Sequence, residues 1–242
     1  MYESQVTFIF DTICPWQVWW IQETGRPSIN KPSRTFLAKK RRLDQALAQV
    51  RATTPPVTFT LHFDPYQLTP DLPASIPSRR EWQLHHKHLD NPDAQAAYHT
   101  HMSSLFEPLG VTLRQDGELG NTLHAHRVVQ YFQESRGENM AGRIVDGLYR
   151  RYFSEGRHPS AGDTLVESCV EAGVPEVEAR EVVADESKGE RDVKAKIRSV
   201  GMDVDAVPVV VVEGKRRDIT LTGAKEVSDY VKALETVIKE SA

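Results

Sequence analysis

The sequence predicts an α/β fold with a central mixed sheet and an inserted all-helical domain. Strand-like segments lie near the start of the chain, amphipathic helical segments fill its middle, and strand-like segments return before a last helix. This order, β-α-β, helical insertion, β-β-α, predicts one domain formed by residues 1–77 plus 186–242 and a second, helical one at residues 78–185.

The first part of the chain is predicted to form a β-α-β unit. Val6–Phe10 (VTFIF) is β-branched and aromatic and predicts a buried strand, and Val57–Phe63 (VTFTLHF) alternates as a second one. Between them, Phe36–Arg51 has apolar side chains at helical spacing, and Pro55-Pro56 ends that helix. Because crossovers of this kind are right-handed, we expect the two strands to be parallel.

The middle of the chain, from about Ser78 to Asp185, has a helical pattern. Pro92 is suited to a first helical turn, and Gly110 and Gly137 follow two other helices, where glycine commonly ends a helix. The predicted helices are Arg79–Leu89, Asp93–Leu109, Asn121–Ser135, Met140–Glu155, Ala161–Glu171 and Val177–Ala184.

Strand character returns in the last fifth of the chain. Val207–Glu213 (VPVVVVE) predicts a buried strand, and a turn leads from it into Asp218–Leu221 (DITL). Ala224–Lys239 places its large apolar side chains on one face, which predicts a final helix against the sheet.

Composition narrows the class of protein. The 242 residues are 39% hydrophobic and 26% charged, which is ordinary for a globular protein. The net charge of −4 gives no basic surface for nucleic acid, and no apolar run approaches the roughly 18 residues of a membrane span. The first residues lack the features of a secretory signal. We therefore expect a cytoplasmic protein with neither nucleic acid nor membrane as a partner.

The motif Cys14-Pro15-Trp16, directly after the first predicted strand, is the strongest sign of chemistry. A cysteine reacts as its thiolate, a helix N-terminus stabilises that anion, and proline suits the first helical turn. Cys14 is therefore the candidate catalytic nucleophile. A redox dithiol would need its second cysteine where Gln17 stands, so Cys14 could attack a disulfide but not resolve the product. The alternative is that Cys14 is a small apolar side chain buried at the end of a strand.

These features resemble the DsbA-like thioredoxin-fold family, in particular its FrnE-like cytosolic branch. The resemblance covers nearly the whole chain and implies a thioredoxin-like fold with a helical insertion. Its landmarks, in order, are Cys14-Pro15-Trp16, Pro65–Pro70 (PYQLTP), Asn121–Arg127 (NTLHAHR), Val207-Pro208 and Thr222-Gly223-Ala224.

The resemblance also implies a site and a reaction. It implies a thiol–disulfide oxidoreductase in which Cys14 attacks the substrate, glutathione resolves the product as co-substrate, and no cofactor is tightly bound. Val207-Pro208 would contain a cis-proline facing the sulfur and would position a protein or glutathione thiol or disulfide. The other site residues expected from the matching motifs are Pro15, Trp16, Gln17, Asn121 and His126.

Two other functions agree with the same resemblance. Kappa-type glutathione transferases and 2-hydroxychromene-2-carboxylate isomerases are related to this family and also use glutathione. A protein of a different class, a catalytically silent binding or chaperone-like protein, would keep the fold after losing its dithiol. The oligomeric state is left open.

The chain departs from the family pattern at residues 17–34. Family members run from Cys-Pro-Trp straight into an amphipathic helix, whereas Thr35 is the first residue here at which that helix pattern resumes. Gly25, Pro27 and Pro32 oppose a continuous helix through the segment. We interpret it as an insertion, and a retained intron is one origin. A transcript that contains every codon would exclude the intron.

The other cysteine and the histidines are interpreted as structural. Cys169 lies in the apolar stripe of a predicted helix (LVESCVEA), so we expect it to be buried. Zinc-binding histidines on one helix usually stand four residues apart, on the same face. That spacing does not occur among His85, His86, His88, His99, His101, His124 and His126, so no metal site is expected.

Overall fold

The computed structural model describes residues 2–15, 42–107 and 111–241. Within these residues the sheet has four strands in the order β2-β1-β3-β4. The α/β fold class is confirmed, and the predicted parallel pairing of the first two strands is correct. β3 runs antiparallel to both β1 and β4. The strands are β1 (Tyr2–Phe10), β2 (Val57–Pro65), β3 (Val209–Val212) and β4 (Ile219–Thr222).

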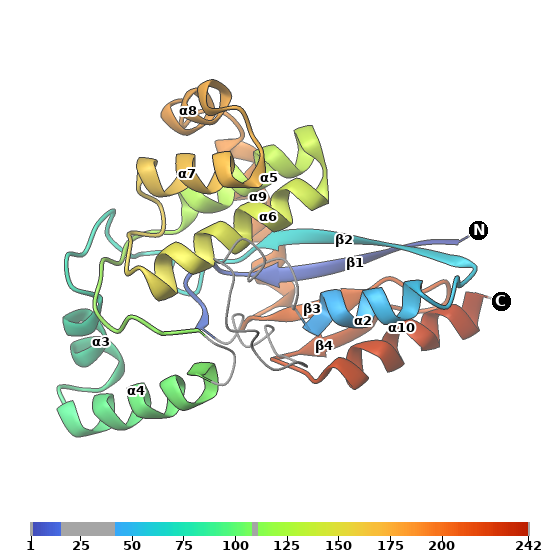
Figure 1. Ribbon diagram of the computed structural model, residues 1–242, viewed down its shortest axis with the longest axis horizontal. Helices are drawn as coiled ribbons and strands as arrows, with labels where there is room; N and C mark the ends of the chain where they lie inside the picture. The colour runs from blue at the N-terminus through green and yellow to red at the C-terminus, as the bar shows by residue number, and fades with distance from the viewer. Residues whose placement is uncertain (1, 16–41, 108–110, 242) are drawn as a thin grey trace, which may run out of the picture.

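Helices cover both faces of this sheet. α2 (Arg42–Arg51) and α10 (Val227–Ser241) lie side by side on one face, and α5 (Leu123–Arg136) and α6 (Glu138–Tyr149) lie on the other (Figure 1). Strands buried on both faces have continuous apolar sequences rather than alternating ones. This explains the apolar runs of β1 and β3, in which Phe10 and Val210 are fully buried.

The remaining helices lie beyond the carboxyl end of β1 and outside α5 and α6 (Figure 1). The side chain of Ser78 caps the first helix of this part by accepting a hydrogen bond from the Glu81 N–H. Asn91 caps the next one, in which Pro92 occupies the first turn. These helices are α3 (Arg79–Lys87), α4 (Pro92–Phe106), α7 (Gly162–Ala172) and α8 (Glu176–Ala184). They lie where helices were predicted, although residues 108–110 at the predicted end of α4 lie outside the described residues.

Two features differ from the predicted order of elements. The single helix predicted over Met140–Glu155 is divided, because α6 ends at Tyr149 and a π-helical turn, η2 (Arg150–Ser154), follows it. A helix that was not predicted, α9 (Glu190–Asp203), packs against β2 and α5. No helix in the described ranges combines the length and the apolar character that a membrane span requires.

Candidate functional site

Cys14 lies just beyond the end of β1, in contact with Val207, which stands with Pro208 directly before β3. The backbone N–H of Cys14 donates to the Asp11 carbonyl, so the chain turns sharply after the strand. The Cys14 thiol donates to the backbone carbonyl of Val207, with 3.5 Å between sulfur and oxygen. The peptide bond between Val207 and Pro208 is cis. Two segments far apart in sequence, at Cys14 and at Val207-Pro208, therefore meet at one point.

The thiol of Cys14 is shielded from solvent. The residue is 2% exposed and packs in a small apolar cluster with Ile9, Val200, Val207 and Val209. Val200 comes from α9, the helix that the sequence pattern did not predict. A thiol can donate to the Val207 carbonyl oxygen, whereas a thiolate cannot, so Cys14 loses this hydrogen bond when it ionises.

The other residues of the Cys-Pro-Trp motif are only partly described. Pro15 has a helical conformation and is half-buried, in agreement with a proline in a first helical turn. Trp16, Gln17 and the predicted insertion at residues 17–34 lie outside the described residues, as does the part of the predicted second helix before Arg42.

His126 contacts an acidic residue that the sequence reasoning missed. Its Nε2 lies 3.3 Å from Oδ1 of Asp11, and both side chains are fully buried. The other carboxylate oxygen of Asp11 accepts a hydrogen bond from the Leu68 N–H at 2.7 Å. The His126 ring also packs edge-on against Phe10. His126 thus holds the end of β1, close to Cys14. Asp11 could have been predicted as a site residue, because it is an acidic residue directly after a buried strand.

Asn121 connects two of the sequence landmarks. Its amide nitrogen donates to the Pro70 carbonyl at 2.7 Å, and its amide oxygen accepts from the side chain of Gln67 at 2.9 Å. The same oxygen accepts from the backbone N–H of Leu123 at the start of α5. Asn121 therefore ties the loop after β2 to α5, and its recorded contacts are with this loop and helix rather than with Cys14.

A pocket opens next to Cys14, bordered by its two neighbours Ile13 and Pro15. Tyr98 from α4 and Tyr152 from η2 also line it. Burial, followed by the charge on an ionised Cys14 and on Tyr152, raises the pKa of Tyr98. The Tyr98 hydroxyl is therefore protonated at neutral pH and able to donate a hydrogen bond. No sequence pattern predicts this pocket, because its walls come from segments that meet only in the folded chain.

Cys169 lies in the apolar core, as its position in the apolar stripe of a helix predicts. Cys169 is completely buried, and this burial raises the pKa of its thiol to about 12. The described part of the chain contains no cluster of three His, Cys, Asp or Glu residues that could hold a metal ion.

Comparisons with known proteins agree with this architecture. The DSBA-like thioredoxin domain family matches residues 36–235. The structure of a probable DsbA oxidoreductase from Streptomyces coelicolor is 22% identical, with a TM-score of 0.73 over 98% of this chain and 91% of that one. The cytosolic disulfide reductase DsbM from Pseudomonas aeruginosa is 15% identical, with a TM-score of 0.57 over 97% and 98% of the two chains. A 2-hydroxychromene-2-carboxylate isomerase is also 15% identical, with a TM-score of 0.53 over 97% and 94%.

These similarities concern the fold, because every one of these identities is below 25%. No curated protein sequence matches the chain. The family match begins at residue 36, after the predicted insertion, and so it does not include Cys14. The chemistry of the site therefore has to be argued from its own residues.

Proposed function

The chain belongs to the DSBA-like thioredoxin domain family, and from this premise we propose that it is a glutathione-linked thiol–disulfide oxidoreductase with Cys14 as its single active-site sulfur. The observation that carries the proposal is the contact between the Cys14 thiol and the Val207 carbonyl. It places a sulfur beside the backbone that would position an extended substrate. Glutathione is kept reduced in the cytoplasm, so we propose this compartment for the reaction.

The reaction consists of two thiol–disulfide exchanges. After Cys14 loses its proton, its sulfur attacks one sulfur of a glutathione mixed disulfide, and the substrate thiolate leaves and takes up a proton. The product is a disulfide between Cys14 and glutathione. A second glutathione, as thiolate, attacks the glutathione sulfur of this bond and restores Cys14. The net change is that one mixed disulfide and one glutathione become one free thiol and one oxidised glutathione.

Two sets of contacts support a positioned sulfur. Asp11, three residues before Cys14, is held by both His126 and the Leu68 N–H, so the chain entering the site is fixed. Tyr98 stays protonated within electrostatic reach of Cys14 and could donate a hydrogen bond to a sulfur anion. Glutathione is the external thiol to test first because the fold is also that of DsbM, of which a structure with glutathione is known.

The test uses the only two cysteines of the chain as variant and control. Reduction of a glutathionylated peptide by glutathione is followed for the unchanged protein, Cys14→Ser and Cys169→Ala. We expect Cys14→Ser to lose the catalysed rate and Cys169→Ala to keep it. Mass spectrometry after incubation with oxidised glutathione should show one glutathionyl adduct, absent from Cys14→Ser. Equal turnover of the unchanged protein and Cys14→Ser would rule out the proposed function.

A second function is favoured by a different observation. Cys14 is 2% exposed and surrounded by apolar side chains, as expected for a protein that keeps the fold without its chemistry. A catalytically silent binding protein would show no adduct at Cys14 and no turnover in the same experiment. It would also tolerate Cys14→Ala with no change in partner binding. The kappa-type transferase or isomerase reaction predicts turnover of a glutathione conjugate that does not require a disulfide.

A further inference from the structure

The pocket beside Cys14 has a lining that indicates the kind of molecule it binds. It is partly open and contains about 460 Å³ of empty space, open solvent included, between the Cys14 loop and helices of the inserted segment. Ile13 and Pro15, the two chain neighbours of Cys14, line it together with the apolar and aromatic side chains of Tyr98, Met102 and Phe153. A lining of this kind suits the apolar or aromatic body of a small molecule.

Two arginines line the same pocket without a negative partner. The buried Arg79 guanidinium donates to the carbonyls of Tyr152 and Asp116, at 3.1 and 3.0 Å, and to that of Arg114, and it stacks on the Tyr152 ring. All of these partners are neutral. Among the described residues, neither Arg79 nor Arg114 has a carboxylate within ion-pair distance. A buried cation without a counter-charge is unfavourable, so an anion in the pocket would be bound favourably.

The other polar groups of the pocket do not supply that negative charge. Tyr98 remains protonated, as described above. His99 is neutral near pH 7, because burial and the positive charges of Arg80 and His88 lower its pKa. Arg79 and Arg114 are therefore the charged side chains among the described residues that line the pocket, although the net charge of the chain is −4.

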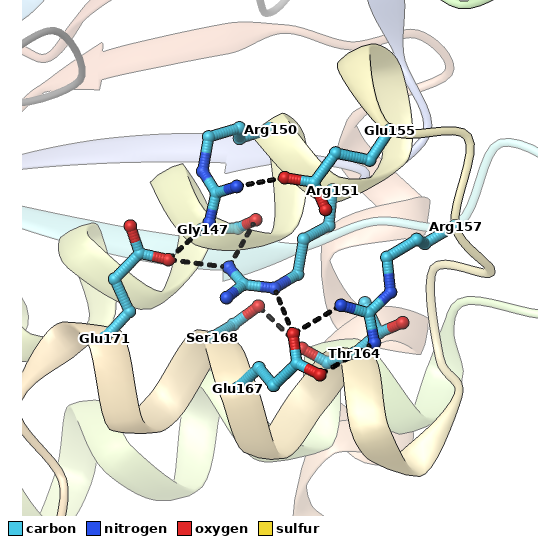
Figure 2. Close-up of polar contacts among 9 residues, drawn as sticks. All are labelled: Gly147, Arg150, Arg151, Glu155, Arg157, Thr164, Glu167, Ser168 and Glu171. Carbon is cyan, nitrogen blue, oxygen red and sulfur yellow. Dashed lines mark hydrogen bonds and ion pairs between the residues drawn. The ribbon is translucent and has the colours of Figure 1, made fainter. Parts of the chain in front are cut away.

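A network of ion pairs holds one wall of the pocket in place. Arg151 of η2, which does not line the pocket, bonds the Gly147 carbonyl at 3.2 Å and Glu171 at 2.8 Å (Figure 2). Glu167 bridges Arg151 and Arg157, and Arg150 bonds Glu171. Figure 2 shows these bonds joining η2 to α7. The wall formed by Tyr152 and Phe153 is therefore fixed before a ligand arrives, and a preformed pocket loses less entropy on binding.

The loop that contributes Arg114 is attached to the same turn. The Arg114 N–H donates to the Phe153 carbonyl at 2.7 Å, and the Glu118 N–H donates to the Gly156 carbonyl at 3.0 Å. A Cβ on Gly117 would lie 2.3 Å from the Gly156 carbonyl oxygen, so the two segments touch backbone to backbone. Arg114 and the aromatic wall thus form one rigid unit.

We propose that this pocket binds the body of the substrate, and that the substrate is a disulfide with an apolar or aromatic body and a carboxylate. This inference rests on the proposed function, because it places the substrate sulfur at Cys14. The body lies against Tyr98 and Met102, and the carboxylate faces Arg79 and Arg114. In the exchange, Cys14 bonds to one substrate sulfur, and the other leaves as a thiolate and takes up a proton.

The test measures how fast Cys14 reacts with two aromatic disulfides. Dithiobis(nitrobenzoate) carries carboxylates, and dithiodipyridine has the same kind of aromatic body without them. A Cys169→Ala background leaves Cys14 as the only thiol. Each rate is divided by the rate with free glutathione, which removes the intrinsic reactivity of the reagent. Because both reagents must reach the same shielded sulfur, the ratio of the two normalised rates reports the carboxylate alone.

We expect the normalised rate with dithiobis(nitrobenzoate) to be about ten times that with dithiodipyridine, as for a charge-assisted hydrogen bond in a pocket. Arg114→Gln should lower this ratio by about threefold or more, while leaving the dithiodipyridine rate unchanged. Arg79→Gln removes bonds to three carbonyls and could unfold the wall, so Arg114→Gln is the deciding variant. Arg180→Gln, an exposed arginine on α8, is the matched control and should leave the ratio unchanged.

Two results would overturn the inference in different ways. If Cys14 reacts with both reagents at equal normalised rates, and Arg114→Gln changes neither, the pocket does not select a carboxylate and the proposed function still stands. If Cys14 of the folded protein reacts with neither reagent, the proposed function fails, and this inference fails with it.

Discussion

The carboxylate of Asp11 and the imidazole of His126 lie 3.3 Å apart with both side chains completely buried. Asp11 follows β1 directly, and His126 lies in the first turn of α5, so the contact joins the sheet to the helices above it. The second oxygen of Asp11 holds the Leu68 N–H. This one carboxylate therefore fixes three segments around the start of the Cys14 loop.

Replacing His126 should destabilise the fold. His126→Ala leaves the Asp11 carboxylate buried with one partner fewer and opens a cavity beside Phe10, so we expect a loss of about 3 kcal/mol in the free energy of unfolding. Urea denaturation measures this loss. His101→Ala, an exposed histidine on α4, is the control and should change stability little.

A double-mutant cycle separates the contact from the cavity. Asp11→Asn is combined with His126→Ala, and the three losses of stability are compared. If the two side chains interact, the double variant loses about 1 kcal/mol less than the sum of the single losses. Strict additivity would mean that His126 acts only by filling space.

The periodicity of apolar residues in the sequence was sufficient to predict most helices and strands in their correct order, but α9 was not predicted. The run Val209–Val212 and the β1 run are apolar because both faces of the sheet are covered, and such runs are visible in a sequence. Val193, Ile197 and Val200 of α9 do stand at helical spacing, but only Val193 and Val200 are buried, and charged side chains make up much of the rest of the helix. This stripe is narrow and was missed, and α9 packs against β2 and α5.

The site was predictable only where residues stand in motifs. Cys14 and Val207-Pro208 were predicted from sequence motifs, and the structure brings them into contact. Asp11 could have been noticed, because it directly follows the first strand. Arg79 and Tyr98 could not have been predicted as pocket residues, because they line the pocket only through the placement of α3 and α4 relative to β1. The π-helical turn that points Tyr152 into the pocket has no pattern that distinguishes it from an α-helix.

The two thiols should differ strongly in reactivity. Burial raises the pKa of Cys169 to about 12, so its thiolate is almost absent at pH 8. We expect dithiodipyridine to modify one thiol per folded chain at pH 8 and two in concentrated guanidinium chloride. Cys14→Ser should abolish the reaction of the folded chain, whereas Cys169→Ala should leave it unchanged. Rapid modification of Cys169 in folded Cys14→Ser would contradict this prediction and show that α7 opens readily.

The ion pairs between η2 and α7 should make the free energy of unfolding depend on pH in the acidic range. Burial alone would raise the pKa of Glu171, but hydrogen bonds from Arg151 and Arg150 outweigh it and lower the pKa below its ordinary value of 4.5. A carboxyl whose pKa is lower in the folded state stabilises the fold above the pKa of the unfolded chain. That contribution is lost as the pH falls from 4.5 through the lower pKa of the folded protein.

Glu171→Gln should therefore remove part of this pH dependence. The side chain of Glu171 is 46% exposed, so screening by water keeps the expected loss at neutral pH below about 1 kcal/mol. The measurement is the free energy of unfolding of both proteins between pH 7 and about pH 3. The two curves should converge as the pH falls, because protonated Glu171 no longer attracts the arginines. Glu181→Gln on α8 is the control. If the curve for Glu171→Gln stays parallel to that of the unchanged protein at all pH values, the carboxylate does not act through its charge.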